Sequence, residues 1–177
     1  MDLIFIDTET TGFGDCRLVE LAWARAEGPI SSLRVKPPIP MLEDAIAIHG
    51  ITEEAVRDLP AFAAHPEYHM LKDLFESNCI VMHNADFDRA VMEREGIRIS
   101  NFICTKRVSR RLYPSLKSHR LQELRDQFYF NAENIAHSAG GDVATLIELY
   151  KKMLSDLEGD GLSTENALTQ MSRFSIH

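Results

Sequence analysis

In Leu3-Ile4-Phe5-Ile6-Asp7-Thr8-Glu9-Thr10-Thr11-Gly12, an apolar run leads into two carboxylates. The run predicts a buried strand over residues 3 to 8. Because side chains two apart on a strand share one face, Asp7 and Glu9 are expected to converge on one point. Two buried acids are costly to desolvate, and a divalent cation would offset that cost. Taken alone, the stretch fits equally well a surface strand end with two solvated acids.

Further apolar segments extend the predicted sheet to five strands. Residues 18–26 and 33–36 predict an antiparallel meander with the first strand, since Glu27-Gly28-Pro29 interrupts the pattern between them. Residues 79–83 and 102–104 predict two shorter strands.

Helical patterns follow the meander. A helix start is predicted at Thr52, and the segment 61–76 is helical in pattern, with Pro66 interrupting or starting the main helix. The remaining helices are predicted over residues 86–95, 105–112, 119–128 and 140–154. Strands first, then alternating helices and strands, indicate an α/β fold with a mixed five-stranded sheet flanked by helices.

Length and composition fit one compact domain. The chain has 177 residues, of which 45% are hydrophobic, enough for a sizeable core. We predict a main domain over residues 1–157 and a tail over 158–177, because Gly159-Asp160-Gly161 is typical of a linker and residues 162–174 have the pattern of a short amphipathic helix.

The sequence also predicts a cytoplasmic protein. No apolar run approaches the roughly 20 residues of a membrane span, and Asp2 stands where a signal peptide carries positive charge. Three widely separated cysteines favour buried thiols in a reducing compartment.

Two further motifs carry acids at other spacings. They are His83-Asn84-Ala85-Asp86-Phe87-Asp88 and His137-Ser138-Ala139-Gly140-Gly141-Asp142. On a helix, acids two residues apart point about 200° apart, so only one of Asp86 and Asp88 can face the site. His137 and Asp142 lie about 140° apart on an ideal helix. His137 is therefore expected in a loop before the helix that Asp142 begins.

The three motifs, in this order, resemble those of the DnaQ-like 3′-5′ exonucleases of the DEDDh type. The segments 47–52 and 103–114 are most similar to the exonuclease X group of that superfamily. The resemblance covers roughly residues 2 to 150 and implies a ribonuclease H-like fold.

The resemblance implies a DNA 3′-5′ exonuclease, acting on single-stranded ends in repair or proofreading. It would release nucleoside 5′-monophosphates by a two-metal mechanism. The implied metal ligands, for two Mg²⁺ or Mn²⁺ ions, are Asp7, Glu9, Asp88 and Asp142. His137 would be the general base, because a neutral imidazole accepts a proton near pH 7. The helical register agrees with an inward Asp88, on the side of Val91 and Met92.

The resemblance also implies contacts to the terminal nucleotide. These residues are Thr10, Thr11, Gly12, Phe13, Ile48, His49, Asn84 and Phe87. Phe13, Ile48 and Phe87 could equally be core residues, and for Ile48 we favour the core. Asn84 could bind substrate or cap the following helix, with capping favoured. His83 is expected to be a structural histidine at a strand end.

The charge distribution is uneven. The net charge of −8 argues against a protein that coats long nucleic acid. Residues 106–120 nevertheless hold six Lys and Arg without an acid, which suits either a phosphate-binding segment or an ordinary solvated helix face.

Two other functions stay open: an exoribonuclease acting on short RNA, and a non-catalytic module that binds a polymerase or nucleic acid. The resemblance also leaves open a homodimer or a polymerase partner, and no membrane partner is predicted.

Overall fold

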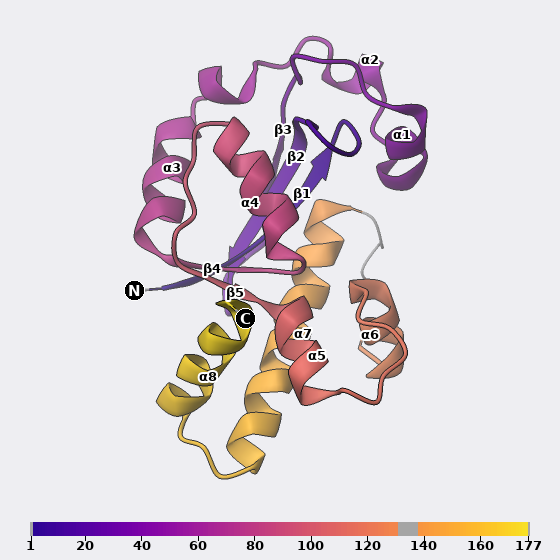
Figure 1. Cartoon of the computed structure of the whole chain (residues 1–177). Coiled ribbons are helices and arrows are strands. Elements are labelled where there is room, and N and C mark those ends of the chain that lie inside the picture. Colours follow the sequence, from indigo (N-terminus) through magenta and orange to yellow (C-terminus); the bar gives the residue numbers. More distant parts are fainter. Residues whose placement is uncertain (1, 131–137, 177) are drawn as a thin grey trace.

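The computed structural model of the chain describes residues 2–130 and 138–176 (Figure 1). Its centre is a five-stranded sheet in the order β3-β2-β1-β4-β5. The strands are β1 (Leu3–Thr10), β2 (Leu18–Arg25), β3 (Ser31–Arg34), β4 (Cys79–Met82) and β5 (Phe102–Cys104). β1, β2 and β3 pair antiparallel, whereas β1–β4 and β4–β5 pair parallel. The predicted mixed sheet and its antiparallel meander are confirmed.

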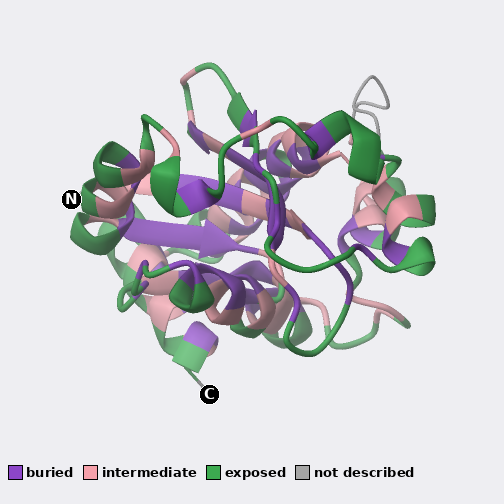
Figure 2. Cartoon of the chain, turned by 90° about the horizontal axis from the view of Figure 1, so that it is seen from above, coloured by how far each residue is buried: buried purple, intermediate pink, exposed green. Residues whose placement is uncertain are grey.

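Helices cover both faces of the sheet. Alternate residues of β1 point to opposite faces, and both sets include apolar side chains that must be buried. Ile4 and Ile6 pack on one face with α3 (Tyr68–Ser77) and α4 (Ala85–Arg94). Phe5 packs on the other face with α7 (Ala139–Gly159). That second core also contains side chains of α5 (Thr105–Leu112), α6 (Leu121–Gln127) and α8 (Thr164–Ile176). Figure 2 shows the buried residues along the strands and on the inward sides of the helices.

Several predicted boundaries shift. β1 continues to Thr10, so Asp7 and Glu9 lie within the strand rather than at its tip. The segment 61–76 is not one helix: a 3-10 turn, Phe62–Ala64, precedes α3, and Pro66 lies between them as predicted. α2 (Glu53–Val56) begins after Thr52, whose side chain accepts a hydrogen bond from Ala55 N at 3.3 Å. Helix α1 (Glu43–His49) was not predicted.

The C-terminal helix packs against the rest of the chain. Ala167 and Met171 of α8 are fully buried in the α7-side core. Ser175 Oγ accepts a hydrogen bond from Cys104 N at 2.8 Å, so α8 covers part of the edge strand β5. The predicted amphipathic helix is confirmed. α7 runs through the predicted boundary at residue 157, and the division into domain and tail stays a prediction.

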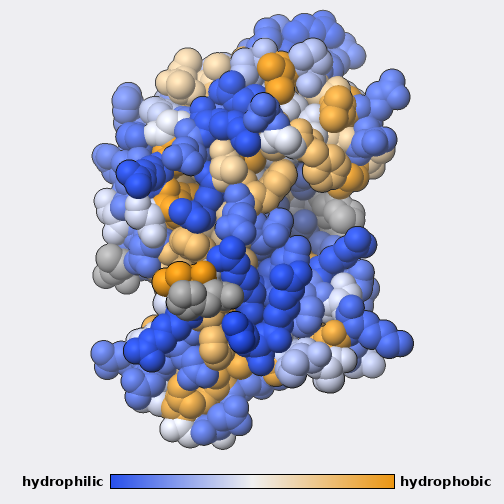
Figure 3. Space-filling model, viewed as in Figure 1, coloured by the Kyte–Doolittle hydropathy of each residue, from blue (hydrophilic) through white to orange (hydrophobic). Residues whose placement is uncertain are grey.

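The surface is mostly hydrophilic in the view of Figure 3, with apolar patches between the polar side chains. All three cysteines are buried and free, as predicted. Among the described residues, no helix has the length and hydropathy needed to cross a membrane.

Candidate active site

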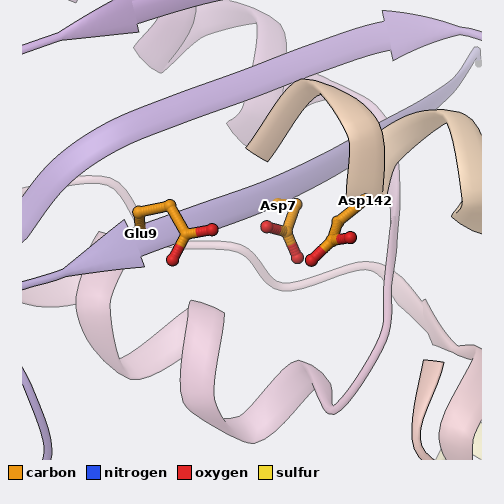
Figure 4. A group of neighbouring side chains, drawn as sticks. All are labelled: Asp7, Glu9 and Asp142. Carbon is orange, nitrogen blue, oxygen red and sulfur yellow. The ribbon is translucent and has the colours of Figure 1, made fainter. Parts of the chain in front are cut away.

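Three carboxylates converge between β1 and α7. Asp7 and Glu9 project from the same face of β1, and Asp142 lies in the first turn of α7 (Figure 4). One oxygen from each carboxylate lies within 4.8 Å of the others. Ser138 is the N-cap of α7, and its hydroxyl accepts a hydrogen bond from Gly141 N at 3.2 Å. Asp142 thus begins a helix at the site, as predicted from its motif.

Burial and mutual repulsion raise the pKa values of two of these acids, Asp7 and Glu9. Burial raises the pKa of Asp7 well above its ordinary value, and the charges of Asp88 and Asp142 raise it further. Burial and the charges of Asp142 and Glu20 raise the pKa of Glu9 to about 8. A cluster of three carboxylates fits a divalent cation, whose positive charge would offset their mutual repulsion.

Asp88 reaches the site from the opposite face of β1. It lies on α4, is 3% exposed, and accepts a hydrogen bond from Thr8 Oγ1 at 2.7 Å. Burial raises the pKa of Asp88, while the Thr8 hydroxyl opposes that rise. Asp88 is therefore close enough for its charge to raise the pKa of Asp7. It lies outside the group formed by Asp7, Glu9 and Asp142. Its predicted register is confirmed: Val91 and Met92 are buried beside it.

The other acid of the middle motif points away from the site. Asp86 is exposed and forms an ion pair with Arg107 at 2.7 Å. His83, at the end of β4, makes hydrogen bonds of 2.9 Å to Thr105 Oγ1 and to the carbonyl of His119. Its predicted structural role is confirmed. His137 lies outside the described residues, so its role stays a prediction.

Six of the eight predicted nucleotide contacts line one pocket beside Glu9. They are Thr10, Gly12, Phe13, Ile48, His49 and Phe87; Thr8, Glu9 and Ala45 complete the lining. Phe13 is 73% exposed and Ile48 50%. The expectation that Ile48 belongs to the core is wrong, because it lies on the outward side of the unpredicted helix α1. Phe87 is partly buried and packs against the α4-side core.

His49 is held by the backbone within this pocket. Its Nδ1 accepts a hydrogen bond from Ile51 N at 3.0 Å, so Nε2 carries the proton and donates to the Thr10 carbonyl at 3.3 Å. Burial lowers the pKa of His49, which favours this neutral form.

The two other predicted contacts lie outside the pocket lining. Thr11 is buried, and its hydroxyl accepts a hydrogen bond from Arg17 N at 3.0 Å. Asn84 precedes α4 with φ 73°, a left-handed conformation that Asn tolerates. Its side chain makes no capping hydrogen bond, and Oδ1 accepts one from Lys106 Nζ at 3.3 Å. The favoured capping role of Asn84 is therefore wrong.

Two residues of the site were not found from the sequence. Glu20 on β2 is 6% exposed; its Oε1 accepts from Arg34 Nε at 2.7 Å, and its Oε2 from Ala139 N at 3.3 Å. It therefore ties the start of α7 to the sheet. A single acid inside Leu18-Val19-Glu20-Leu21-Ala22 was the available signal.

The second is Gln122 on α6, whose Nε2 donates a hydrogen bond to Asp142 Oδ1. Its buried Oε1 makes no hydrogen bond within the described part of the chain. Nothing in the local sequence distinguishes Gln122 from an ordinary helix-surface glutamine.

Comparison with known proteins finds similarity to exonucleases. The family model described as "Exonuclease" (RNase_T) matches residues 4–150. "DNA polymerase III subunit epsilon" of Pasteurella multocida is 30% identical, over 85% of this chain and 67% of the relative. "Exodeoxyribonuclease 10" of Escherichia coli K12 is 37% identical, over 65% of this chain and 50% of the relative. The chain thus spans about half to two thirds of these relatives.

A solved structure described as "Exonuclease X in complex with 5' overhanging duplex DNA" superimposes with a TM-score of 0.72 at 26% identity, covering 98% of this chain and 99% of the other. The expected ribonuclease H-like fold is confirmed by this likeness. The chain belongs to the DnaQ-like exonuclease family, as its three motifs predicted.

Proposed function

We propose that this chain is a metal-dependent 3′-5′ exodeoxyribonuclease that releases nucleoside 5′-monophosphates from DNA ends. The observation that carries the proposal is the convergence of Asp7, Glu9 and Asp142 within 4.8 Å, directly beside a pocket with exposed aromatic and apolar side chains. A phosphodiester at this junction would meet the carboxylates while its terminal nucleotide occupies the pocket.

Asp7, Glu9 and Asp142 would hold divalent ions, with Asp88 completing the predicted set of four ligands. Mg²⁺ or Mn²⁺ is proposed on the chemistry of the donors, which are all carboxylates. A divalent ion bound there supplies Lewis-acid stabilisation of phosphate charge and lowers the pKa of water.

The other residues bind and orient the end of the strand. Phe13 and Phe87 would stack on or wedge against the terminal base, a contact that tolerates any sequence and is worth about 1–3 kcal/mol per base. Thr10, Gly12, Ile48 and His49 would complete the walls of the pocket. His137 would accept a proton from water as the general base.

DNA is proposed over RNA because the relative Exodeoxyribonuclease 10 and the Exonuclease X complex are described by their action on or binding to DNA. A role in DNA repair or proofreading and a cytoplasmic location accompany this proposal. The epsilon relative is named as a polymerase subunit, and a polymerase is accordingly the partner we propose in preference to a homodimer. Co-elution with a replicative polymerase during gel filtration would support it, and a stable homodimer would contradict it.

The test incubates 5′-labelled single-stranded DNA and an RNA twin with the wild-type protein in Mg²⁺, Mn²⁺ or EDTA. A DNA ladder that shortens from the 3′ end, needs metal and is lost in Asp7→Asn would support the proposal. Asp73→Asn is the matched control, because Asp73 is an exposed acid on α3. A folded wild-type protein that binds Mn²⁺ but cuts neither strand would overturn it.

A further inference from the structure

Helix α5 presents its cations along two flanks. The helix buries one face in the core, made of Thr105, Val108 and Ser109. At about 100° per residue, Lys106 and Arg110 lie on one side of that buried face, and Arg107 and Arg111 lie on the other. The four cations on α5, out of the six in residues 106–120, therefore form two separate pairs.

Among the described residues, Arg107 is the one cation of α5 that has an ion-pair partner. Arg107 pairs with Asp86 and donates to the carbonyl of Ser175 on α8, so it serves packing. For Lys106 and Arg110, no carboxylate of the described residues lies within ion-pair distance, 4.0 Å. Like charges at i and i+4 repel by about 0.2–0.5 kcal/mol. Within the described part of the chain, no acid within 4.0 Å offsets that repulsion between Lys106 and Arg110.

Lys106 and Arg110 lie close to two histidines, His83 directly after β4 and His119 shortly before α6. His119 Nδ1 lies 2.9 Å from Ser109 Oγ, and the His119 carbonyl lies 2.9 Å from His83 Nε2. These bonds hold the segment before α6 against α5. Burial lowers the pKa of His119, and the charges of Arg110 and Lys106 lower it further. Lys106, Arg110 and His119 therefore form one patch of surface.

That patch lies at the same end of the sheet as the carboxylates, because α5 begins directly after β5, which is parallel to β4 and through it to β1. In the parallel β1–β4 pair, Phe5 is opposite Val81, so His83 follows β4 at the level of Asp7. Lys106 contacts Asn84, the residue that precedes α4 and its Asp88. Figure 1 shows α5 below the start of α4, and Figure 3, in the same view, shows strongly hydrophilic surface over this region.

We propose that Lys106 and Arg110 form a phosphate-binding flank that holds the backbone of the substrate strand upstream of its 3′ end. The chain has a net charge of −8, so most of its surface repels a polyanion, and a basic flank beside the site offsets this locally. Lys and Arg on phosphates fix the position of a strand without reading its sequence. This inference rests on the proposed function, because it assumes a nucleic-acid strand at the site.

The test compares wild type with Lys106→Gln/Arg110→Gln, which removes both charges from the flank. Binding of a long single strand is measured by fluorescence anisotropy in EDTA across a salt series. The slope of log K against log salt should become shallower by about 0.7 for each phosphate that is no longer neutralised, or about 1.4 for the pair. The KM for long DNA in Mn²⁺ should rise with kcat unchanged. Cleavage of a dinucleotide should be unaffected, because its one phosphodiester must lie at the carboxylates.

Arg25→Gln/Lys151→Gln is the matched control. Arg25 pairs with Asp2 and Lys151 with Glu27, and Arg25 lies opposite Ile4, at the other end of β1 from Glu9. An equal reduction of the salt slope in this control, or no reduction in the α5 variant, would overturn the inference. Failure of the proposed function would appear separately, as wild-type protein that cuts no strand in Mn²⁺ while the binding slopes still report on the flank.

Discussion

The acids on the two faces of β1 lie in different surroundings. On the α7 face, Asp7, Glu9 and Asp142 approach within 4.8 Å of one another, and burial and mutual repulsion raise the pKa of Asp7 and Glu9. On the α4 face, Asp88 is also buried but receives the hydroxyl of Thr8 at 2.7 Å. A bound cation would therefore help to keep Asp7 and Glu9 ionised on the α7 face, whereas on the α4 face the Thr8 hydroxyl already favours the ionised form of Asp88.

The largest effect is expected from replacing an acid on the α7 face. Asp7→Asn should lower DNA cleavage by more than about 100-fold, because even residues that only support metal ligands cost about 10–100-fold. Cleavage rates at saturating Mn²⁺ and calorimetric Mn²⁺ titration are the measurements. Asp88→Asn should weaken Mn²⁺ binding less than Asp7→Asn, since Asp88 lies outside the converging group. The reverse ranking would contradict the difference between the faces.

The next largest effect is expected from replacing Glu20, which links α7 to the sheet. Glu20→Ala removes the acceptor for Ala139 N and frees Arg34, and should lower activity by about 10–100-fold, as for residues that support metal ligands. Glu20→Gln keeps an acceptor and should recover part of this activity. Because the charge of Glu20 raises the pKa of Glu9, both variants should shift the acid limb of the pH–rate profile to lower pH. An unshifted limb would leave Glu20 with a purely structural role.

Without metal, the raised pKa of Glu9 should make the free energy of unfolding depend on pH. The folded-state pKa of Glu9 is raised from 4.5 to about 8, so the folded protein binds the extra proton between these values. In EDTA, the free energy of unfolding should therefore fall as pH rises through this window. Saturating metal should offset the fall, by about 2.7 kcal/mol at 100 times its Kd.

Urea unfolding at pH values below and above the window measures this dependence. Glu9→Gln should flatten it, whereas Asp73→Asn, an exposed acid on α3, should not. An unchanged slope in Glu9→Gln would show that other groups cause the effect.

The smallest effect is expected on the α4 face. Thr8→Val removes the donor to Asp88 and should destabilise the protein by about 1–3 kcal/mol, the cost of leaving a buried acceptor unpaired. It should also raise the pKa of Asp88, because the hydroxyl lowers it at present. Chemical denaturation and NMR titration of the Asp88 carboxyl check both effects. Thr8→Ser retains the hydroxyl and should behave like wild type; equal damage in both variants would point to impaired packing instead.

Local patterns predicted much of the fold. The strand over Leu3–Ile6, the helix over residues 105–112 and the inward register of Asp88 follow from periodicity. Helix α1 was missed because Glu43–His49 is short and has one buried residue, Ala45. Missing that helix also misplaced Ile48, which is exposed in the pocket.

Two hydrogen-bonding roles depended on contacts across the fold. Asn84 was expected to cap α4, yet its left-handed backbone and the neighbouring Lys106 direct its side chain elsewhere. Glu20 reaches α7 only because β2 lies beside β1 under that helix. Neither partner is adjacent in sequence, so propensity and periodicity carried no information about them.

The sequence by itself determined the type of chemistry: an apolar strand carrying Asp7 and Glu9, followed by two acidic motifs in the order of the DnaQ-like exonucleases. Only the tertiary structure decided that Asp142 joins Asp7 and Glu9 while Asp88 pairs with Thr8. The physical reason is that strand alternation is a local property of two-residue period, whereas the approach of a helix to one face depends on the core that packs beneath it.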